Sequence, residues 1–265
     1  MISSVVGSFV VLRGQLFAGH ALTDVATAGG TGAVLLGTST LAGFLVAGLS
    51  GAGAIEAIGA DRVRERNIAT GIVLGAATGL SALFVYLTET TTTSSSTSAV
   101  ILFGSLFTIS NSVVPVTLIL GTVAVITTTV MARPLSLSSL SIDLARSRGV
   151  KVRLVGWTFM ATVAVTVGLA SLVVGSILAT ALLIGPAAAA QRLSSSLTKS
   201  VLVASVFGVT TTWAGILLAY DSYDWTASHR SLPVSFCVVT VTVIIYVISV
   251  GVSRVSTFRH PPKVA

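Results

Sequence analysis

Residues 13–30 read RGQLFAGHALTDVATAGG and lie between apolar segments of a chain that is mostly hydrophobic. The stretch holds His20 and Asp24, the only histidine and the only aspartate that we place inside the hydrophobic region. They are four residues apart, so on a helix their side chains lie one above the other on the same face. A charged side chain at membrane depth costs about 2.5–3.5 kcal/mol on insertion scales, and this cost indicates that the pair has a use.

The composition indicates the class of fold. The chain has 265 residues, of which 53% are hydrophobic and 9% charged, and its mean hydropathy is +0.98. A soluble domain carries about 25% charged residues. The apolar runs are continuous, whereas the strands of a transmembrane barrel alternate. We therefore expect an all-α, polytopic membrane protein in which residues 1–265 form a single transmembrane domain.

Apolar runs separated by short polar segments predict about eight or nine transmembrane helices. Residues 1–12 are apolar but too short to span, since a helix needs about 20 residues to cross a bilayer. We expect this first span to be truncated, or to be longer than the sequence shows. Residues 99–109 are also short, and Asn111 and Pro115 interrupt the pattern, which is typical of a half-helix or an interfacial turn. The longer runs lie at roughly 16–37, 40–57, 68–88, 113–132, 154–173, 175–190, a run that ends at Tyr220, and 234–252.

The basic residues predict the orientation, because cytoplasmic loops carry an excess of lysine and arginine. If the spans alternate, Arg230 alone falls on one side, which puts the loop 221–233 outside and the C-terminus in the cytoplasm of a cell membrane. The net charge of +7 is thereby explained, and no nucleic-acid partner is required. The fourteen basic residues on the cytoplasmic side are Arg13, Arg62, Arg64, Arg66, Arg133, Arg146, Arg148, Lys151, Arg153, Arg192, Lys199, Arg254, Arg259 and Lys263.

His20 and Asp24 favour a transient metal site, because imidazole suits zinc, manganese and iron and carboxylate suits the harder ions. One histidine and one aspartate are too few ligands alone, but two copies in a symmetric dimer supply four. Three alternatives stay open from the residues alone. The pair can be a structural hydrogen bond that ties a broken helix, a proton or ion relay in a self-contained secondary transporter or channel, or part of a membrane scaffold.

Other polar or special residues have simpler interpretations. Glu56, at the end of a span, is expected to form an interfacial salt bridge with Arg62 or Arg64. Pro186 inside a span predicts a kink with a structural or gating role. The outer loop holds Asp221, Asp224 and His229. We expect it to be solvated and to contact a delivery protein; the alternative is a funnel for the metal. Cys237 is a packing residue. No Walker motif or glycine-rich phosphate loop is present, so any ATPase must be another chain.

Four segments together resemble the permease subunits of ABC-type importers for manganese, zinc and iron. They occur in the family's order and cover nearly the whole chain. They are GSFVVLRGQLFAGHAL (7–22), ILFGSLFTIS (101–110), SIDLARSRGVKV (141–152) and GSILATALLIGPAAAAQRL (175–193).

The resemblance implies the fold of vitamin B12 and metal-chelate type importer permeases, and a divalent metal that is carried, with no permanently bound cofactor. It implies a permease homodimer, two ATPase subunits at the cytoplasmic loop 133–153, and an extracytoplasmic metal-binding protein. The docking segment would be a short helix that Ser141 caps and Gly149 ends. Its other residues are Asp143, Leu144, Ala145 and Arg146.

The chain departs from the family at the metal motif. The family pattern has aspartate first and histidine four residues later, whereas His20 and Asp24 stand in the exchanged order. The family's Pro-Gly after the motif is also missing, and Ala28-Gly29-Gly30 stands near that place. The ligand types on the helix face are therefore preserved, while their order along the helix is reversed.

Overall fold

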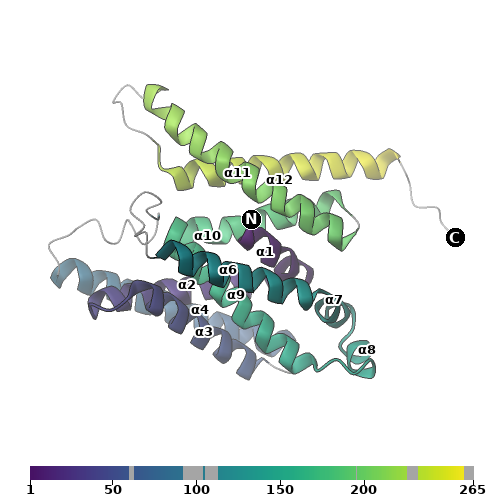
Figure 1. Ribbon diagram of the computed structural model, residues 1–265, viewed down its shortest axis with the longest axis horizontal. Helices are drawn as coiled ribbons and strands as arrows, with labels where there is room; N and C mark the ends of the chain where they lie inside the picture. The colour runs from purple at the N-terminus through teal and green to yellow at the C-terminus, as the bar shows by residue number, and fades with distance from the viewer. Residues whose placement is uncertain (60–62, 92–103, 105–112, 195, 226–231, 260–265) are drawn as a thin grey trace.

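A computed structural model describes residues 1–59, 63–91, 104, 113–194, 196–225 and 232–259. In this part of the chain every regular element is a helix, as the composition predicts (Figure 1). The helices are α1 (Ile2–Leu12), α2 (Leu16–Leu35), α3 (Thr40–Ile58), α4 (Val63–Thr91), α6 (Val113–Val130), α7 (Ala132–Leu140), α8 (Ile142–Ser147), α9 (Val152–Val174), α10 (Ser176–Leu193), α11 (Leu197–Trp225) and α12 (Val234–Arg259).

Seven of the described helices are long and apolar enough to cross a membrane: α3, α4, α6, α9, α10, α11 and α12. The all-α, polytopic class is therefore confirmed. α2 is not in this set, and its 20 residues include His20, Asp24, four glycines and three threonines. The predicted count of eight or nine crossings stays a prediction, because 92–103 and 105–112 lie outside the described residues.

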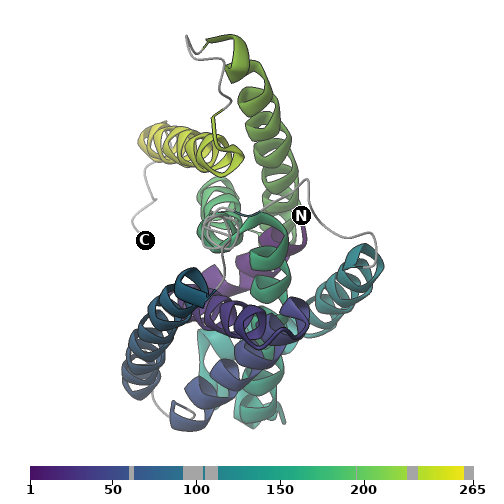
Figure 2. The ribbon, with the colours of Figure 1, turned by 90° about the vertical axis from the view of Figure 1, so that its left-hand side faces the viewer.

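Two groups of helices meet where α9 packs against α10. α9 packs against α2 and α3, and α10 packs against α1, α11 and α12. In Figure 1, α2, α3, α4 and α9 lie in the lower part of the molecule and α11 and α12 at the top, with α10 between them; Figure 2 shows the same separation from the side. The largest core cluster joins α1, α2, α3 and α9, and its members include Phe9, Leu22, Ile55, Phe159 and Met160.

Small residues let the helix backbones approach closely, as in many transmembrane bundles. A Cβ atom on Gly7 of α1 would collide with the carbonyl of Leu183 in α10, and one on Gly29 of α2 would collide with Gly43 in α3. The Ser4 hydroxyl donates a hydrogen bond of 3.5 Å to the Leu182 carbonyl along the same α1–α10 contact. Glycines that are far apart in the sequence therefore set the spacing between α1 and α10 and between α2 and α3.

Two segments that we expected to be loops contain helices. Most of 133–153 forms α7 and α8, and α11 continues through the start of the predicted loop 221–233 to Trp225. In α7 the Ser136 hydroxyl donates to the Ala132 carbonyl at 2.7 Å, and Leu135 is fully buried. Serine hydroxyls that bond back to their own helix satisfy polar groups without a loop, which the serine-rich composition of this segment conceals.

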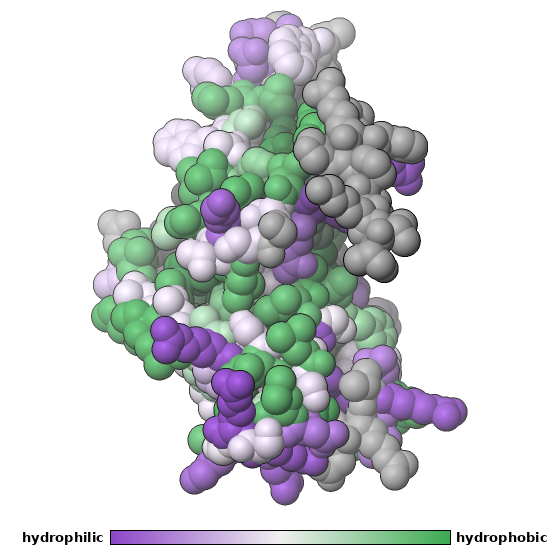
Figure 3. Space-filling view, turned by 90° about the vertical axis from the view of Figure 1, so that its right-hand side faces the viewer, coloured by the Kyte–Doolittle hydropathy of each residue, from purple (hydrophilic) through white to green (hydrophobic). Residues whose placement is uncertain are grey.

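Polar and apolar surfaces are separated along the helices. Figure 3 shows hydrophobic side chains over much of the middle of one face and hydrophilic side chains gathered at its lower end, at the height of α8. In Figure 1 the helices α7 and α8 and the end of α12 lie at the right, whereas α11 ends at the left. Exposed Leu, Ile and Val side chains of α4, α6, α11 and α12 suit contact with lipid.

Candidate functional site

His20 and Asp24 stand one turn apart on α2, the helical arrangement that their spacing predicts. The imidazole Nδ1 of His20 lies 3.4 Å from the Thr180 hydroxyl of α10, within hydrogen-bond distance. Asp24 is half-buried, and its carboxylate interacts electrostatically with His20. The sequence gives no sign of Thr180, because 160 residues separate it from His20.

The face of α2 that carries His20 is uncovered. His20 itself is exposed, and the neighbouring apolar side chains of Leu16 and Phe17 are 37% and 44% exposed. Leu16 and Thr180 line an open, largely apolar hollow of about 450 Å³ between α10 and α12, together with Ile184, Val239, Thr242 and Tyr246. An imidazole that faces lipid is costly, so we expect another protein surface to cover this face of α2.

Among the residues that the structure describes, the His20–Asp24 pair has no third ligand in the same chain. Across the described residues, no group of three or more His, Cys, Asp and Glu side chains is placed to hold a metal ion. A single chain therefore offers one imidazole and one carboxylate, which is an incomplete shell for a transition metal.

The predicted docking segment is a capped helix. The Ser141 hydroxyl accepts a hydrogen bond of 3.3 Å from the Leu144 amide at the start of α8, so the predicted N-cap is confirmed. Gly149 has φ of 77°, and the Gly149 and Val150 amides donate to the Arg146 and Ala145 carbonyls, each at 3.0 Å. This is the Schellman arrangement that glycine permits, and it ends α8 as predicted.

α8 turns its apolar edge outward. Ala145 is fully buried, whereas Ile142 is 40% and Leu144 is 44% exposed. Asp143 and Arg146 are exposed as well. The exposed part of the Leu144 side chain is therefore available to another subunit.

The remaining predicted residues are dispersed. Pro186 is buried inside α10, which runs without a break from Ser176 to Leu193, so its gating role stays a prediction. The segment 101–110, apart from Gly104, and His229 lie outside the described residues.

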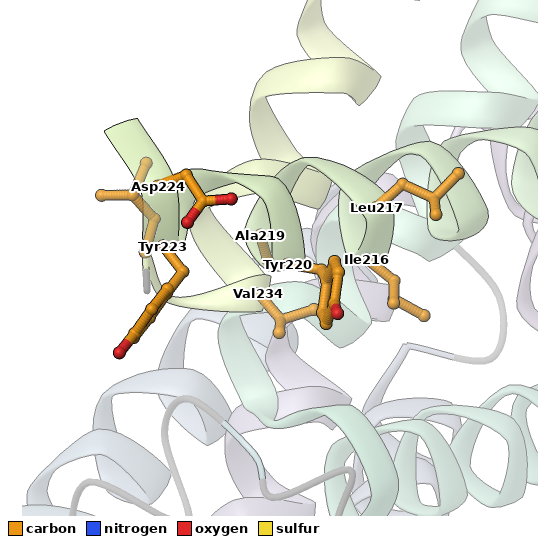
Figure 4. Close-up of a pocket in the computed structure, with 8 residues that line it drawn as sticks. Ile216, Leu217, Ala219, Tyr220, Tyr223, Asp224 and Val234 are labelled. Carbon is orange, nitrogen blue, oxygen red and sulfur yellow. The ribbon is translucent and has the colours of Figure 1, made fainter. Parts of the chain in front are cut away.

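A second hollow, of about 690 Å³, lies at the end of α11. Asp224 lines it, whereas Asp221 stands outside its lining (Figure 4). Tyr220, Tyr223 and Leu217 also line this hollow, which the sequence did not reveal, because its walls come from two helices.

Glu56 is not the interfacial salt-bridge residue that we expected. It is 3% exposed, and its Oε2 has no hydrogen-bond partner among the described residues. Of the two expected partners, Arg62 lies outside the described residues, and the charges that act on Glu56 are those of Arg66, Arg13 and Arg153. The expectation was wrong because Glu56 lies against Gly156, on the inner face of α3, where a Cβ atom on that glycine would collide with Oε1.

Nearly the whole sequence matches a known family. The profile of the family described as "ABC 3 transport family" matches residues 1–253. The chain belongs to the ABC 3 transport family. Members of this family are permease subunits, and ATP is hydrolysed on a separate chain, so this protein is a multi-pass membrane subunit and not an enzyme. A self-contained secondary transporter or channel is not favoured.

Curated relatives extend the similarity. The manganese import system permease protein ScaB of Streptococcus parasanguinis is 26% identical over 249 residues, which are 94% of this chain and 85% of the relative. The manganese transport system membrane protein MntC of Halalkalibacterium halodurans is 30% identical, over 83% of this chain and 75% of the relative. The high-affinity zinc uptake system membrane protein ZnuB of Buchnera aphidicola is 32% identical over 113 residues, 43% of this chain and 40% of the relative.

Two solved structures share the fold. PsaBC from Streptococcus pneumoniae, in complex with Fab, superposes with a TM-score of 0.78 at 24% identity over 94% of this chain and 86% of its own. A metal-chelate type ABC transporter in an inward-facing conformation superposes with a TM-score of 0.71 at 17% identity over 94% and 83%. The expected fold of metal-chelate type permeases is thereby confirmed.

Proposed function

We propose that this permease moves a divalent transition metal ion into the cytoplasm, with manganese, zinc and iron as the candidate cargoes. The observation that carries the proposal is the exposed His20 beside Asp24 on an uncovered face of α2. Imidazole and carboxylate together suit these ions, and a small shell that binds weakly suits release. Relatives named for manganese and for zinc support the same class of cargo.

In this proposal two copies of the chain form a homodimer around the pathway. The second copy covers the α2 face around His20 and contributes its own pair, so that two imidazoles and two carboxylates are available. The open hollow beside Thr180, which is lined by apolar side chains of α10 and α12, supports such an interface. ATP binding and hydrolysis then expose the shared site to each side in turn.

The other partners follow from the two ends of the molecule. An ATPase subunit docks on α8, whose Ile142 and Leu144 side chains are exposed, and this end is cytoplasmic together with the C-terminus. An extracytoplasmic metal-binding protein delivers the ion at the opposite end, where α11 terminates.

The test is metal accumulation per folded transporter in cells that depend on this transporter for the metal. His20→Ala and Asp24→Ala should each lower Mn²⁺ accumulation about 10-fold or more, because each removes a ligand type from the shell. Thr78→Ala is the control, since Thr78 is an exposed threonine of α4 whose hydroxyl donates to carbonyls of its own helix. Unchanged accumulation of Mn²⁺, Zn²⁺ and Fe²⁺ per molecule in both alanine variants would remove the pair from the pathway.

A further inference from the structure

A second group of polar side chains is buried at the end of the molecule that carries α8. Gln15, in the turn between α1 and α2, is 5% exposed, and Glu56, near the end of α3, is 3% exposed. Arg13 is half-buried in the same turn, and its guanidinium lies over the Phe159 ring of α9, 5.2 Å from the centroid. These three side chains, Arg13, Gln15 and Glu56, are here named the polar cluster.

Four buried side-chain atoms of the polar cluster have no hydrogen-bond partner among the described residues. They are Arg13 Nη1, both amide atoms of Gln15 and Glu56 Oε2. A buried polar group without a partner costs about 1–3 kcal/mol, and more when the group is charged. Four such atoms at one place need an explanation beyond stable packing.

The Arg13 guanidinium and the Glu56 carboxylate interact electrostatically, but in the described structure they form no close ion pair. Arg66, Arg13 and Arg153 all act on the Glu56 carboxylate. A static clasp would satisfy Glu56 in this conformation, because breaking a buried pair is expensive. The unsatisfied atoms of Arg13 and Glu56 would gain partners if the two side chains met in another conformation.

The polar cluster is connected to the docking helix through α9 and to the metal pair through the start of α2. Glu56 and Arg13 both contact the first turns of α9, at Gly156 and Phe159, and α9 begins five residues after α8 ends. On the other side, Gln15 is the residue before α2, and His20 lies five positions further on. These contacts offer a route by which a displacement of α8 would reach Glu56 and Arg13 through α9, and the helix of His20 through the turn.

We propose that Arg13, Gln15 and Glu56 form a switch that couples the docking helix to the metal pair, with the guanidinium and carboxylate in direct contact in one transport state and apart in the other. The inference rests on the proposed function, because it assumes that α8 receives the ATPase and that His20 and Asp24 receive the metal. Glu56 and Arg13 are positioning residues in this proposal and do not contact the ion.

The experiment measures Mn²⁺ transported per ATP hydrolysed by the complete transporter in vesicles. Glu56→Gln and Arg13→Gln keep much of the side-chain volume and remove one charge each. Each should lower this ratio about 5-fold or more, the size of a typical coupling between sites, while ATPase association stays as in the unmodified transporter. The double variant should be no worse than either single one, because both remove the same pair.

Two further variants complete the design. Arg64→Gln is the matched control, since Arg64 is an exposed arginine at the start of α4, and it should leave the ratio unchanged. Gly156→Ala pushes the carboxylate away from α9 with all charges intact, and it replaces Glu56→Gln if that variant fails to accumulate.

The outcomes separate the two proposals. A ratio close to that of the unmodified transporter in Glu56→Gln, Arg13→Gln or Gly156→Ala, or losses that add in the double variant, would overturn the switch. The same holds if uptake falls only in proportion to folded protein. An unmodified transporter that hydrolyses ATP without moving Mn²⁺, Zn²⁺ or Fe²⁺ would instead contradict the proposed function.

Discussion

The Thr180 hydroxyl of α10 lies 3.4 Å from the Nδ1 of His20 on α2, and so connects the candidate metal ligand to a second helix. A metal-binding histidine usually bonds through its other ring nitrogen to a partner that fixes the ring orientation. With Thr180 at Nδ1, Nε2 is the nitrogen that remains for an ion. This arrangement makes Thr180 part of the candidate site although it carries no charge.

Replacing Thr180 tests that role. Thr180→Val keeps the shape and removes the hydroxyl, and metal uptake per folded transporter should fall about 10-fold because the imidazole loses its orienting partner. Thr210→Val is the control, since the hydroxyl of this exposed threonine bonds only to its own helix. Equal uptake in the Thr180 and Thr210 variants would mean that the 3.4 Å contact has no part in transport.

The order of the two ligands should matter less than their presence. The double change His20→Asp with Asp24→His keeps both ligand types on the same face but moves each by one turn, about 5–6 Å. We expect partial Mn²⁺ uptake in this variant and a changed preference among Mn²⁺, Zn²⁺ and Fe²⁺. Competition between the three ions in one uptake assay measures the preference. Loss as complete as in either single alanine variant would show that the order is essential.

The docking helix should be tested at its exposed edge. Leu144→Asp should weaken ATPase association without unfolding the permease, because Leu144 is 44% exposed and makes little contact inside this chain. Ala145 is a poor probe, since it is fully buried and a large residue there disrupts α8 itself. Leu232→Asp, at a 40% exposed leucine just before α12, is the control. Co-purification of the ATPase in equal amount with both variants would exclude Leu144 from the interface.

The end of α8 gives an independent prediction. Gly149→Val forces a β-branched residue into φ of 77°, which costs about 1–3 kcal/mol and favours a different end for α8. Coupled uptake should fall, whereas Gly149→Asn should be tolerated better because asparagine adopts positive φ more readily. Equal uptake in the Val and Asn variants would argue against a need for this turn.

Helix packing by glycine is tested with a matched pair of sites. Gly29→Val brings a side chain into Gly43 and Ala47 of α3 and should destabilise the protein by at least about 1–3 kcal/mol. Gly75→Ala meets open space on α4 and should be neutral or stabilise by up to about 1 kcal/mol. Thermal unfolding in detergent compares the two variants. A Gly29→Val protein that unfolds no earlier than the unmodified one would contradict the close α2–α3 contact.

Much of this protein could be predicted from local sequence. Continuous apolar runs predict helices that cross a membrane, because no other backbone arrangement satisfies its polar groups there except a closed barrel. The ends of α8 were predictable from Ser141 and Gly149, since capping depends on residues within one or two turns. The four-residue spacing of His20 and Asp24 likewise determines that the two side chains share one face of a helix.

Tertiary structure decided the surroundings of those residues. Thr180 meets His20, and Glu56 is buried against Gly156 rather than paired at an interface, through contacts between helices that are far apart in the chain. The polar cluster of Arg13, Gln15 and Glu56 exists only because the α1–α2 turn, α3 and α9 converge at one end. The helical period of 3.6 residues determines which side chains share a face of a helix, but it does not determine which other helix packs against that face. That choice depends on the shapes of whole helices packed together, and here glycines such as Gly29 and Gly156 set how closely they approach.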